Sequence, residues 1–435
     1  MKYAVITFGC RVNQADSLGF EEDLIARGGV ASPPSDADLV IVNTCSVTAT
    51  SDQGARQTIR RVARDNPSAR IVVTGCYATR ESQQIAALPN VIRVVANDDK
   101  PQLVRLITKA TTEPTERTEE DLFSVGSVTS VVALGDGPCG ATIAPGVMGR
   151  TAYTLRVQTG CAEPCSYCII PSTRGVPRST PIAELLREIE RVTAVGFKEI
   201  ALTGVHLGSY GRDIGCALLD LLRGVERSAS LSGERLLFRI SSLEPMDCTR
   251  DIVDLVATSG SFAPHFHLPL QHASDRVLAA MRRPYTIEYY ASLVDAIRHR
   301  IPHASIGSDI IVGFPGETDD DFEQLVSYLE GSPLTHVHVF PYSDRPGTVA
   351  SRLPGKVHGS VIRERARRIR EIAGGLTERF RDAQIGTTHT ALTIEDGSLV
   401  VTDNYLKLRI PPGRARNEWV SVRVTSHHDG ELLAG

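Results

Sequence analysis

The run TGCAEPCSYCIIP places Cys161, Cys165 and Cys168 in the spacing CxxxCxxC. Three thiolates at this spacing can be held at one centre, although a coincidence of cysteines is one alternative. Such a spacing suits three corners of a cubane iron–sulfur cluster, whereas a fully ligated cubane takes four cysteines. One iron then keeps an open position, where a ligand can bind and react. A zinc knuckle is another alternative, but it needs a fourth ligand, and His206 is distant in sequence.

Length and composition place the chain among ordinary globular proteins. Its 435 residues suffice for about three domains of roughly 150 residues. No apolar run approaches the roughly 20 residues of a membrane helix, and MKYAVITFGC lacks the features of a signal peptide. We therefore expect a cytoplasmic protein without membrane contact. In that reducing compartment, nine cysteines favour metal or redox chemistry over disulfides.

Residues 1–98 alternate short apolar runs with helical patterns. Strands are predicted at 3–8, 38–44, 70–75 and 91–95, with helices at 17–27, 52–64 and 81–88. This alternation indicates a parallel sheet covered on both faces, as in a flavodoxin-like α/β domain. We assign residues 1–110 to it.

A cysteine ends each of the first three predicted strands: Cys10, Cys45 and Cys76. Ligands of open α/β sheets bind at the carboxyl ends of the strands, so these cysteines should converge. Gly9 and Gly75 precede two of them and allow close backbone approach. Three buried cysteines acting as small apolar fillers are the alternative. The shared position favours a second three-cysteine metal site.

Residues 111–150 change character and are predicted to be a linker. They begin with an acidic Thr/Pro-containing stretch and end in a Gly/Pro-rich one. Cys139 in this linker, and Cys216 and Cys248 further on, have no partner at a ligand spacing. We treat these three as non-ligating.

Residues 151–342 contain about six strand–helix units, with strands near 154–158, 199–204, 236–241, 265–270, 305–313 and 335–342. Six units are too few for a closed eight-stranded barrel, so a partial (β/α)6 barrel is expected. Working residues of such barrels lie at the carboxyl ends of strands, and the CxxxCxxC run follows the first strand. A basic helix at 356–385 completes a domain spanning 151–385. Alternating runs and turns at 386–435 predict a small β-barrel.

With these elements in place, the chain resembles the radical S-adenosylmethionine (SAM) methylthiotransferases along nearly its whole length. Within that family it is most similar to the branch acting on tRNA N6-threonylcarbamoyladenosine (t6A). The motifs behind this resemblance are FGCRVNQADS, VNTCSVTATSD, LTGVHLGSYG, MRRPYT, SDIIVGFPGET and VFPYSDRPGT. One departure is QHASD at 271–275, where the family usually has Gln-Ser-Gly-Ser. Another is the short terminal barrel, TRAM-like and RNA-binding by resemblance, whose net formal charge is about −1.

The resemblance implies methylthiolation of C2 of t6A at position 37 of tRNA. It implies two [4Fe-4S] clusters, one on each cysteine group, and two SAM molecules per turnover. The CxxxCxxC cluster would cleave SAM to a radical, and the other would carry the sulfur. Implied partners are the tRNA anticodon stem-loop, a reductase, flavodoxin or ferredoxin as electron donor, and a sulfur donor system. Nothing argues for an oligomer, so a monomer is expected.

Other readings of the chain stay open at this point. The acceptor could instead be dimethylallyl-adenosine 37 of tRNA or an aspartate of a ribosomal protein, because the chemistry is shared. From another class, the chain could be a non-catalytic iron–sulfur or zinc protein that binds RNA. Iron content and SAM cleavage after reconstitution separate these classes.

Candidate SAM contacts follow from the barrel motifs. Tyr167 lies inside the cysteine loop, where its ring or backbone could lie along the adenine of SAM. A role as a packing aromatic is an equally weighted alternative. Gly204 resembles the glycine motif that receives the SAM amino group. Candidates for ribose or carboxylate contacts at later strand ends are Ser242, Glu244, Asp309 and Gly313.

Candidate RNA contacts are arginines. Arg56, Arg60 and Arg64 recur every four residues and share one helix face. Arg174 and Arg178 follow the cysteine loop, and Arg282–Arg283 follow a predicted helix. For any single one of these arginines, the alternative to RNA binding is an ordinary solvated surface position. With the basic helix at 356–385, they form a possible path for the anticodon stem-loop.

Overall fold

The computed structural model describes residues 1–109, 143–146, 150–428 and 431–434. The chain forms two compact units. One contains Met1–Ile143 and Ile169–Gly175, and the other contains Ala144–Cys168 and Val176–Gly435. Most of the predicted linker at 111–150, with Cys139, lies outside the described residues. Among the described helices, none is long and apolar enough to cross a membrane.

The first unit is built on a five-stranded parallel sheet in the order β2-β1-β3-β4-β5. This is the strand order of flavodoxin-like folds, so the predicted fold class is confirmed. The strands are β1 (Lys2–Thr7), β2 (Val30–Ala31), β3 (Leu39–Thr44), β4 (Arg70–Gly75) and β5 (Val91–Val95). Only β2, a two-residue edge strand, was not expected from the apolar runs.

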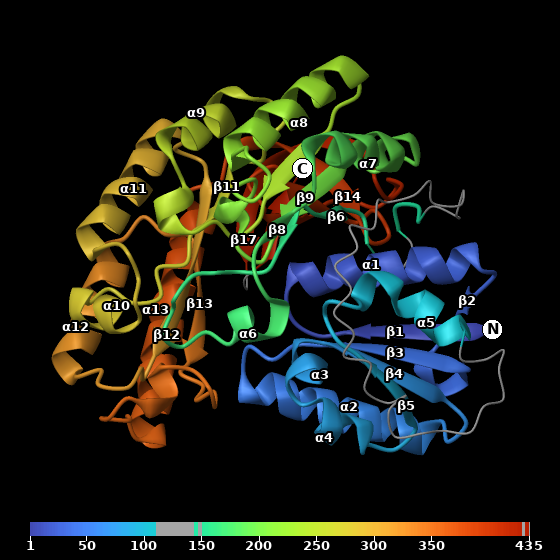
Figure 1. Ribbon diagram of the computed structural model, residues 1–435. Coiled ribbons are helices and arrows are strands. Elements are labelled where there is room, and N and C mark those ends of the chain that lie inside the picture. Colours follow the sequence, from blue (N-terminus) through green and yellow to red (C-terminus); the bar gives the residue numbers. More distant parts are fainter. Residues whose placement is uncertain (110–142, 147–149, 429–430, 435) are drawn as a thin grey trace. The chain divides into compact units, whose positions relative to one another are not determined.

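Helices cover both faces of this sheet (Figure 1). The apolar residues of β3 alternate between two cores, which explains its uninterrupted apolar run. One core includes α1 (Arg11–Ala26) and α5 (Leu103–Lys109). The other includes α2 (Ala49–Asp65), α3 (Cys76–Arg80) and α4 (Ser82–Ala86). The first unit also holds α6 (Ile170–Arg174).

The second unit contains the six predicted parallel strands as two three-stranded sheets. One sheet has the order β10-β9-β6 and the other β11-β12-β13. The strands are β6 (Tyr153–Arg156), β9 (Glu199–Thr203), β10 (Leu237–Ile240), β11 (His265–His267), β12 (Ser305–Val312) and β13 (His336–Pro341). A parallel bridge between Phe238 and Phe262 links the two sheets.

Helices connect these strands in the expected alternation (Figure 1). They are α7 (Ile182–Ala194), α8 (Leu218–Ser232), α9 (Arg250–Thr258), α10 (Asp275–Ala280), α11 (Ile287–Arg300) and α12 (Asp319–Gly331). A short antiparallel pair, β7 (Gln158–Thr159) and β8 (Arg178–Ser179), flanks the cysteine loop in sequence. The partial barrel expected from the sequence is therefore present.

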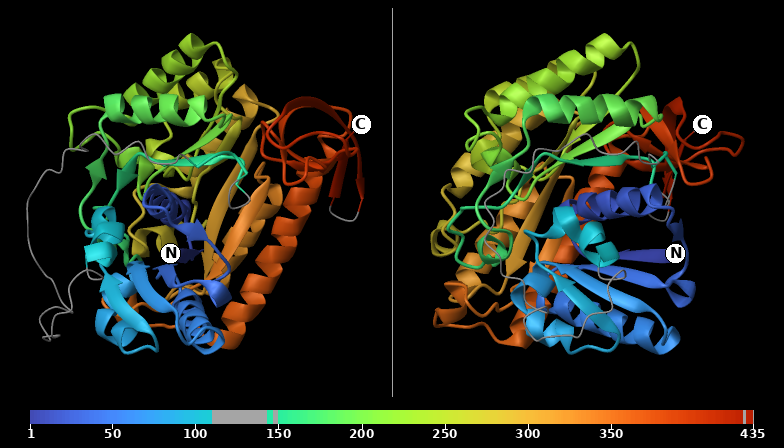
Figure 2. Two further views of the ribbon diagram at one scale, coloured as in Figure 1. Left: turned by 90° about the vertical axis from the view of Figure 1, so that its right-hand side faces the viewer. Right: turned by 45° about the vertical axis from the view of Figure 1, so that its right-hand side comes forward.

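Helix α13 (Gly359–Asp382) packs against β12 and β13 and leads into the C-terminal barrel (Figure 2). The barrel is closed in the order β14-β15-β16-β18-β17, which confirms the predicted small barrel. Its strands are β14 (Thr388–Ile394), β15 (Leu399–Thr402), β16 (Lys407–Arg409), β17 (Trp419–His428) and β18 (Glu431–Ala434).

A buried ion pair fastens this barrel to the six-stranded part of the unit. Arg239 of β10 is 1% exposed and pairs with Glu199 of β9 at 2.7 Å. Its remaining guanidinium donors reach the carbonyl oxygens of Thr402 and Asp403, each at 2.8 Å. One guanidinium thus satisfies a buried carboxylate and two barrel carbonyls together.

Replacing Arg239 with Met should lower the free energy of unfolding by about 3–5 kcal/mol, because Glu199 would be left as an unpaired buried charge. Urea unfolding of the cluster-free protein, followed by the fluorescence of Trp419 in the barrel, measures the loss. The matched control is Arg223→Met, on the exposed side of α8. Equal midpoints for the two variants would contradict the anchoring role.

Candidate metal centres

Cys10, Cys45 and Cys76 are here called the rim cysteines. Cys45 and Cys76 follow β3 and β4 directly, and Cys10 comes shortly after β1, which ends at Thr7. These strands are neighbours in the sheet, so the three cysteines share its carboxyl edge. Gly9 has φ +89°, and a Cβ there would lie 2.6 Å from Cys45 Sγ. Gly75 has φ +100°, and a Cβ there would lie 2.1 Å from the Thr44 carbonyl oxygen. Only glycine permits these two close approaches.

Buried cations lie beside one of the rim cysteines. Arg174 donates from Nε to Cys76 Sγ at 3.4 Å, and 3% of its side chain is exposed. Burial alone would raise the pKa of the Cys76 thiol. The charges of Arg174 and Lys100 outweigh burial, so this pKa is lowered. Cys76 is therefore poised as a thiolate ligand.

The same cations are held by a buried polar network. Lys100 Nζ lies 2.7 Å from Asp16 Oδ2, and Arg174 Nη2 lies 3.3 Å from the same oxygen. Asn13 Oδ1 accepts from Arg174 at 2.5 Å. Two cations thus face one carboxylate and one thiol. This balance stabilises negative charge on Cys76 or on a group bound to it.

Cys45 has the opposite electrostatic environment. Burial, together with the neighbouring Cys10 and Cys76 thiolates, raises its pKa to about 11. Three thiols close enough to affect one another cannot all ionise cheaply without a cation between them. The rim cysteines are therefore suited to a positively charged metal group.

Cys161, Cys165 and Cys168, here called the loop cysteines, lie between β7 and α6. Arg283 Nη1 donates to Cys165 Sγ at 3.1 Å, and Arg283 is 6% exposed. Burial raises the pKa of Cys165, while the charge of Arg283 opposes this rise. Arg283 also pairs with Glu244 and donates to the Tyr285 hydroxyl at 3.1 Å.

A second cation, His206, lies beside Cys161. Burial lowers the pKa of His206, but hydrogen bonds to Asp247 and Cys161 raise it to about 10. Its Nε2 lies 2.8 Å from Asp247 Oδ2, and its Nδ1 lies 3.7 Å from Glu163 Oε1. The imidazole is therefore protonated at neutral pH and compensates negative charge on Cys161.

The spacing of the thiols argues against a single zinc ion at either cysteine group. Thiolates 2.3 Å from a tetrahedral zinc lie about 3.8 Å apart. Among the described residues, one group places three His, Cys, Asp or Glu ligand atoms within 4.8 Å of one another, and it contains no cysteine. In each cysteine group the three sulfurs are therefore not all within 4.8 Å of one another. Three thiolates with an adjacent cation are a donor set that suits a cubane with one open iron.

Two of the predicted SAM contacts lie beside the loop cysteines. Tyr167 packs in an apolar cluster with Met281, Phe314 and Ala350, which matches its packing alternative. Glu244 is occupied by its pair with Arg283. Both residues lie beside the loop cysteines, but the Glu244 carboxylate is paired with the Arg283 guanidinium.

Gly204 and Ser242 lie at the ends of β9 and β10. Gly204 packs on Gln158, where a Cβ would lie 3.0 Å from Oε1. That Gln158 oxygen accepts from the His206 amide at 3.0 Å, so Gly204 makes room for the loop holding His206. Ser242 is exposed.

The two candidates on β12 and its following turn are engaged by the protein itself. Asp309 Oδ1 lies 3.1 Å from nitrogens of both His267 and His338. Burial would raise the pKa of Asp309, but these hydrogen bonds hold it well below its usual range. The Gly313 amide donates to Glu317 Oε2 at 2.6 Å. Neither residue is placed as a free SAM contact.

The predicted RNA arginines divide by exposure. Arg60, Arg64 and Arg178 are exposed. Arg56 is half-buried and donates to the Tyr77 hydroxyl at 2.6 Å. Arg174 and Arg283 contradict the prediction, because both are buried and bonded to cysteine sulfurs rather than presented to RNA.

The predicted basic helix is also less available than its composition indicates. Arg365 of α13 is buried and pairs with Glu317 at 2.6 Å. Arg367 pairs with Glu364, and Arg368 pairs with Glu323. These ion pairs neutralise much of the positive charge that would attract phosphates.

Sequence reasoning missed the cations that accompany the cysteines. Lys100, His206 and the true role of Arg283 carry no spacing signal, because each lies far along the chain from its partner. Arg174 follows Cys168 closely, and it was assigned to RNA for that reason. Of the cysteines treated as non-ligating, Cys248 is buried and its pKa is raised to about 12.

Replacing Arg174 with Met should raise the pKa of the Cys76 thiol, because burial would then act with less opposition. Alkylation of cluster-free protein by iodoacetamide, followed for each cysteine by mass spectrometry across pH, measures this. The midpoint of each rate–pH curve reports the pKa whatever the access. In the unsubstituted protein Cys76 should titrate below Cys45. Arg60→Met is the control, and an unchanged Cys76 midpoint in Arg174→Met would contradict the pairing.

Two family comparisons cover most of the chain. Residues 155–329 match the Radical SAM superfamily. Residues 2–97 match a family described as Uncharacterized protein family UPF0004. The two matches contain the loop cysteines and the rim cysteines respectively.

Curated relatives match nearly the full length. A threonylcarbamoyladenosine tRNA methylthiotransferase MtaB from Aquifex aeolicus is 36% identical, covering 94% of this chain and 96% of that protein. An MtaB from Thermotoga maritima is 34% identical, covering 97% and 93%. A tRNA-2-methylthio-N(6)-dimethylallyladenosine synthase from Carboxydothermus hydrogenoformans is 32% identical, covering 90% and 87%.

Solved structures share the fold at low sequence identity. The radical S-adenosylmethionine methyltransferase TsrM from Kitasatospora setae has a TM-score of 0.55 at 17% identity, covering 78% of this chain and 72% of that one. The cobalamin-dependent S-adenosylmethionine radical enzyme OxsB has a TM-score of 0.53 at 10% identity, covering 86% and 56%. These likenesses concern the fold alone.

Proposed function

This chain belongs to the radical SAM methylthiotransferase family, and we propose that it methylthiolates C2 of N6-threonylcarbamoyladenosine at position 37 of tRNA. The observation that carries the proposal is the presence of two three-cysteine groups, each with a buried cation against a cysteine sulfur. The similarity to proteins named for this nucleoside supports the choice of acceptor.

We assign one [4Fe-4S] cluster to the rim cysteines and one to the loop cysteines, with SAM bound at the loop site. When bound, the loop cluster and SAM supply a radical for a C–H bond that no side-chain base can deprotonate. A cluster held by Cys10, Cys45 and Cys76 would carry or donate the sulfur. Radical chemistry of this kind belongs to cofactors, and the chain contributes binding, orientation and charge.

The residues around the loop cysteines define what the protein itself does there. Arg283 and His206 place positive charge against Cys165 and Cys161. The charge of Arg283 opposes the rise that burial causes in the pKa of Cys165. Glu244 orients Arg283, and Asp247 holds His206 protonated. Tyr167 and its apolar neighbours keep water from one side of the loop.

At the rim, Arg174 is the positioning residue. It bonds both Cys76 and Asn13, so one side chain fixes the thiol and the start of α1. Asn97 Nδ2 adds a weak contact to Cys76 Sγ at 3.7 Å. Two donors on one sulfur lower its basicity and limit its rotation.

We propose a division of labour between residues 1–110, 151–385 and 386–435, joined by the linker 111–150. The last segment and the exposed Arg60, Arg64 and Arg178 are proposed to contact the anticodon stem-loop. Proposed further partners are a reductase, flavodoxin or ferredoxin and a sulfur donor. We expect a cytoplasmic monomer.

Mass spectrometry of tRNA nucleosides from a strain lacking this gene tests the acceptor. The 2-methylthio form of t6A should disappear and unmodified t6A should accumulate, because the step would be lost. The 2-methylthio form of dimethylallyl-adenosine should be unchanged and serves as the internal control. Loss of that second nucleoside with retention of the first would overturn the assignment in favour of the other tRNA branch.

If both nucleosides were retained, the tRNA assignment would be wrong, and the acceptor would be sought among ribosomal proteins. Complementation with the unsubstituted gene must restore the lost nucleoside. A Cys216→Ala gene should complement equally well, because that cysteine belongs to neither group.

A further inference from the structure

Four histidines and one aspartate share one face of the sheet β11-β12-β13. They occur in the runs HFH (265–267), GSD (307–309) and HVH (336–338). Side chains alternate between faces along a strand, so each HxH pair points to one side. The register pairs His267 with Gly307, Gly307 with His336, and Asp309 with His338. Neighbouring residues of a parallel ladder face the same way, which brings these side chains together.

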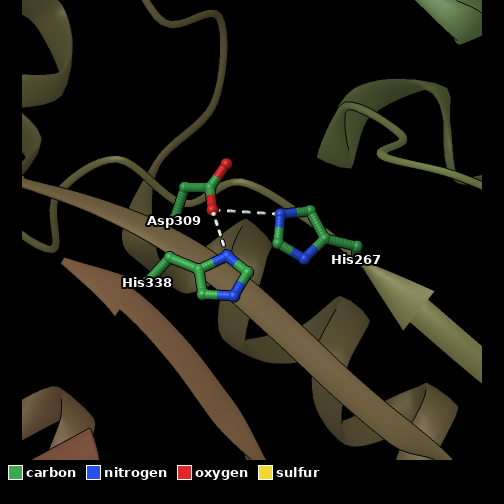
Figure 3. Close-up of side chains that lie close together, drawn as sticks. All are labelled: His267, Asp309 and His338. Atoms are coloured by element: carbon green, nitrogen blue, oxygen red, sulfur yellow. Dashed lines mark hydrogen bonds and ion pairs between the residues drawn. The ribbon is translucent and has the colours of Figure 1, made fainter. Parts of the chain in front are cut away.

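Three of these side chains converge on one point (Figure 3). His267 Nε2 and His338 Nδ1 each lie 3.1 Å from the same oxygen of Asp309. All three ligand atoms lie within 4.8 Å of one another. Each side chain comes from a different strand, so the backbone that carries them is rigid.

Gly307 makes the arrangement possible. A Cβ at this position would lie 2.0 Å from His336 Nε2, so any other residue would displace that imidazole. With glycine there, His336 packs 6.0 Å from His267 and 5.7 Å from His338, between ring centroids. The His336 imidazole therefore packs against the rings of both His267 and His338.

We propose that His267, Asp309 and His338 bind a divalent transition-metal ion, such as zinc or ferrous iron, with at least one position left open. Two imidazoles and one carboxylate are a ligand set used for catalytic zinc and for non-haem iron. Metal–ligand bonds of about 2.0–2.2 Å place tetrahedral ligand atoms about 3.3–3.6 Å apart. The two observed 3.1 Å separations need only a small expansion to admit the ion.

The surroundings allow an ion to enter and stay accessible. The side chain of His338 is 60% exposed, that of Asp309 25%, and that of His267 14%. The trio thus has two partly buried ligands and one exposed ligand, which leaves one side open. Asp309 lies on the same face of β12 as Ile311, which packs in the cluster containing Tyr167. The site therefore lies on the face of β12 against which the cluster containing Tyr167 packs, and none of its three residues is a cysteine ligand.

Zinc is the probe, because a nitrogen and oxygen site for ferrous iron also binds zinc, usually more tightly. One equivalent of zinc sulfate is added anaerobically to protein already loaded with its iron–sulfur clusters. Zinc K-edge X-ray absorption then reports the ligands of zinc without interference from iron. We expect nitrogen and oxygen ligands at about 2.0–2.1 Å from zinc, and no sulfur ligand at about 2.3 Å.

Variants assign the site. Asp309→Asn and His338→Asn should each weaken zinc affinity at least about tenfold in competition with a fluorescent chelator. His299→Ala, which removes an exposed histidine on α11, should leave the affinity unchanged. Iron content per chain should be equal in all four proteins, which shows that the variants fold. Three results would each overturn the proposal: zinc bound only through sulfur, no bound zinc, or a zinc affinity in the Asp309 and His338 variants equal to that of the unsubstituted protein. The three side chains would then be a hydrogen-bonded packing cluster.

Discussion

Charge compensation of buried and partly buried thiols is the interaction on which both cysteine groups depend. A thiolate removed from water is costly unless a cation lies beside it. The chain meets this requirement with Arg174 and Lys100 at Cys76, and with Arg283 and His206 at the loop cysteines. Each cation is itself held by a carboxylate: Asp16, Glu244 or Asp247. The carboxylates thus act on the cysteines through the cations that lie between them.

Strand order brings the rim cysteines to one edge of the sheet. In the order β2-β1-β3-β4-β5, the strands that precede Cys10 and Cys45 are neighbours at the point where the order reverses. Ligands of such sheets bind at that point. Gly9 and Gly75 then remove the side chains that would keep the loops apart. Topology and two glycines convert three cysteines distant in sequence into one group.

Much of this was predictable because the relevant signals are local. Uninterrupted apolar runs marked the buried parallel strands, and the cysteines that follow them marked the rim. Helix α1 begins at Arg11, earlier than its apolar periodicity indicated, and Cys10 precedes it without a side-chain capping bond. The two-residue strand β2 had no pattern to detect.

The partners of the cysteines were not predictable, because burial of a charged residue depends on contacts far along the chain. Arg174 and Arg283 look like surface arginines in sequence, yet each bonds a cysteine sulfur. Gly313 looked like a ligand-facing glycine, yet Glu317 takes its amide and Ile362 fills the space beside it. His267, Asp309 and His338 were not predicted to lie together, because only the strand register shows that they converge.

We propose that the loop cysteines serve SAM cleavage and the rim cysteines serve sulfur insertion. The most direct test measures 5′-deoxyadenosine and methylthiolated tRNA in the same reduced reaction. It compares the unsubstituted enzyme with the Cys45→Ala, Cys165→Ala and Cys216→Ala variants. Cys165→Ala should form neither product, Cys45→Ala should still form 5′-deoxyadenosine but no methylthiolated tRNA, and Cys216→Ala should form both. Methylthiolated tRNA from Cys45→Ala would contradict the account.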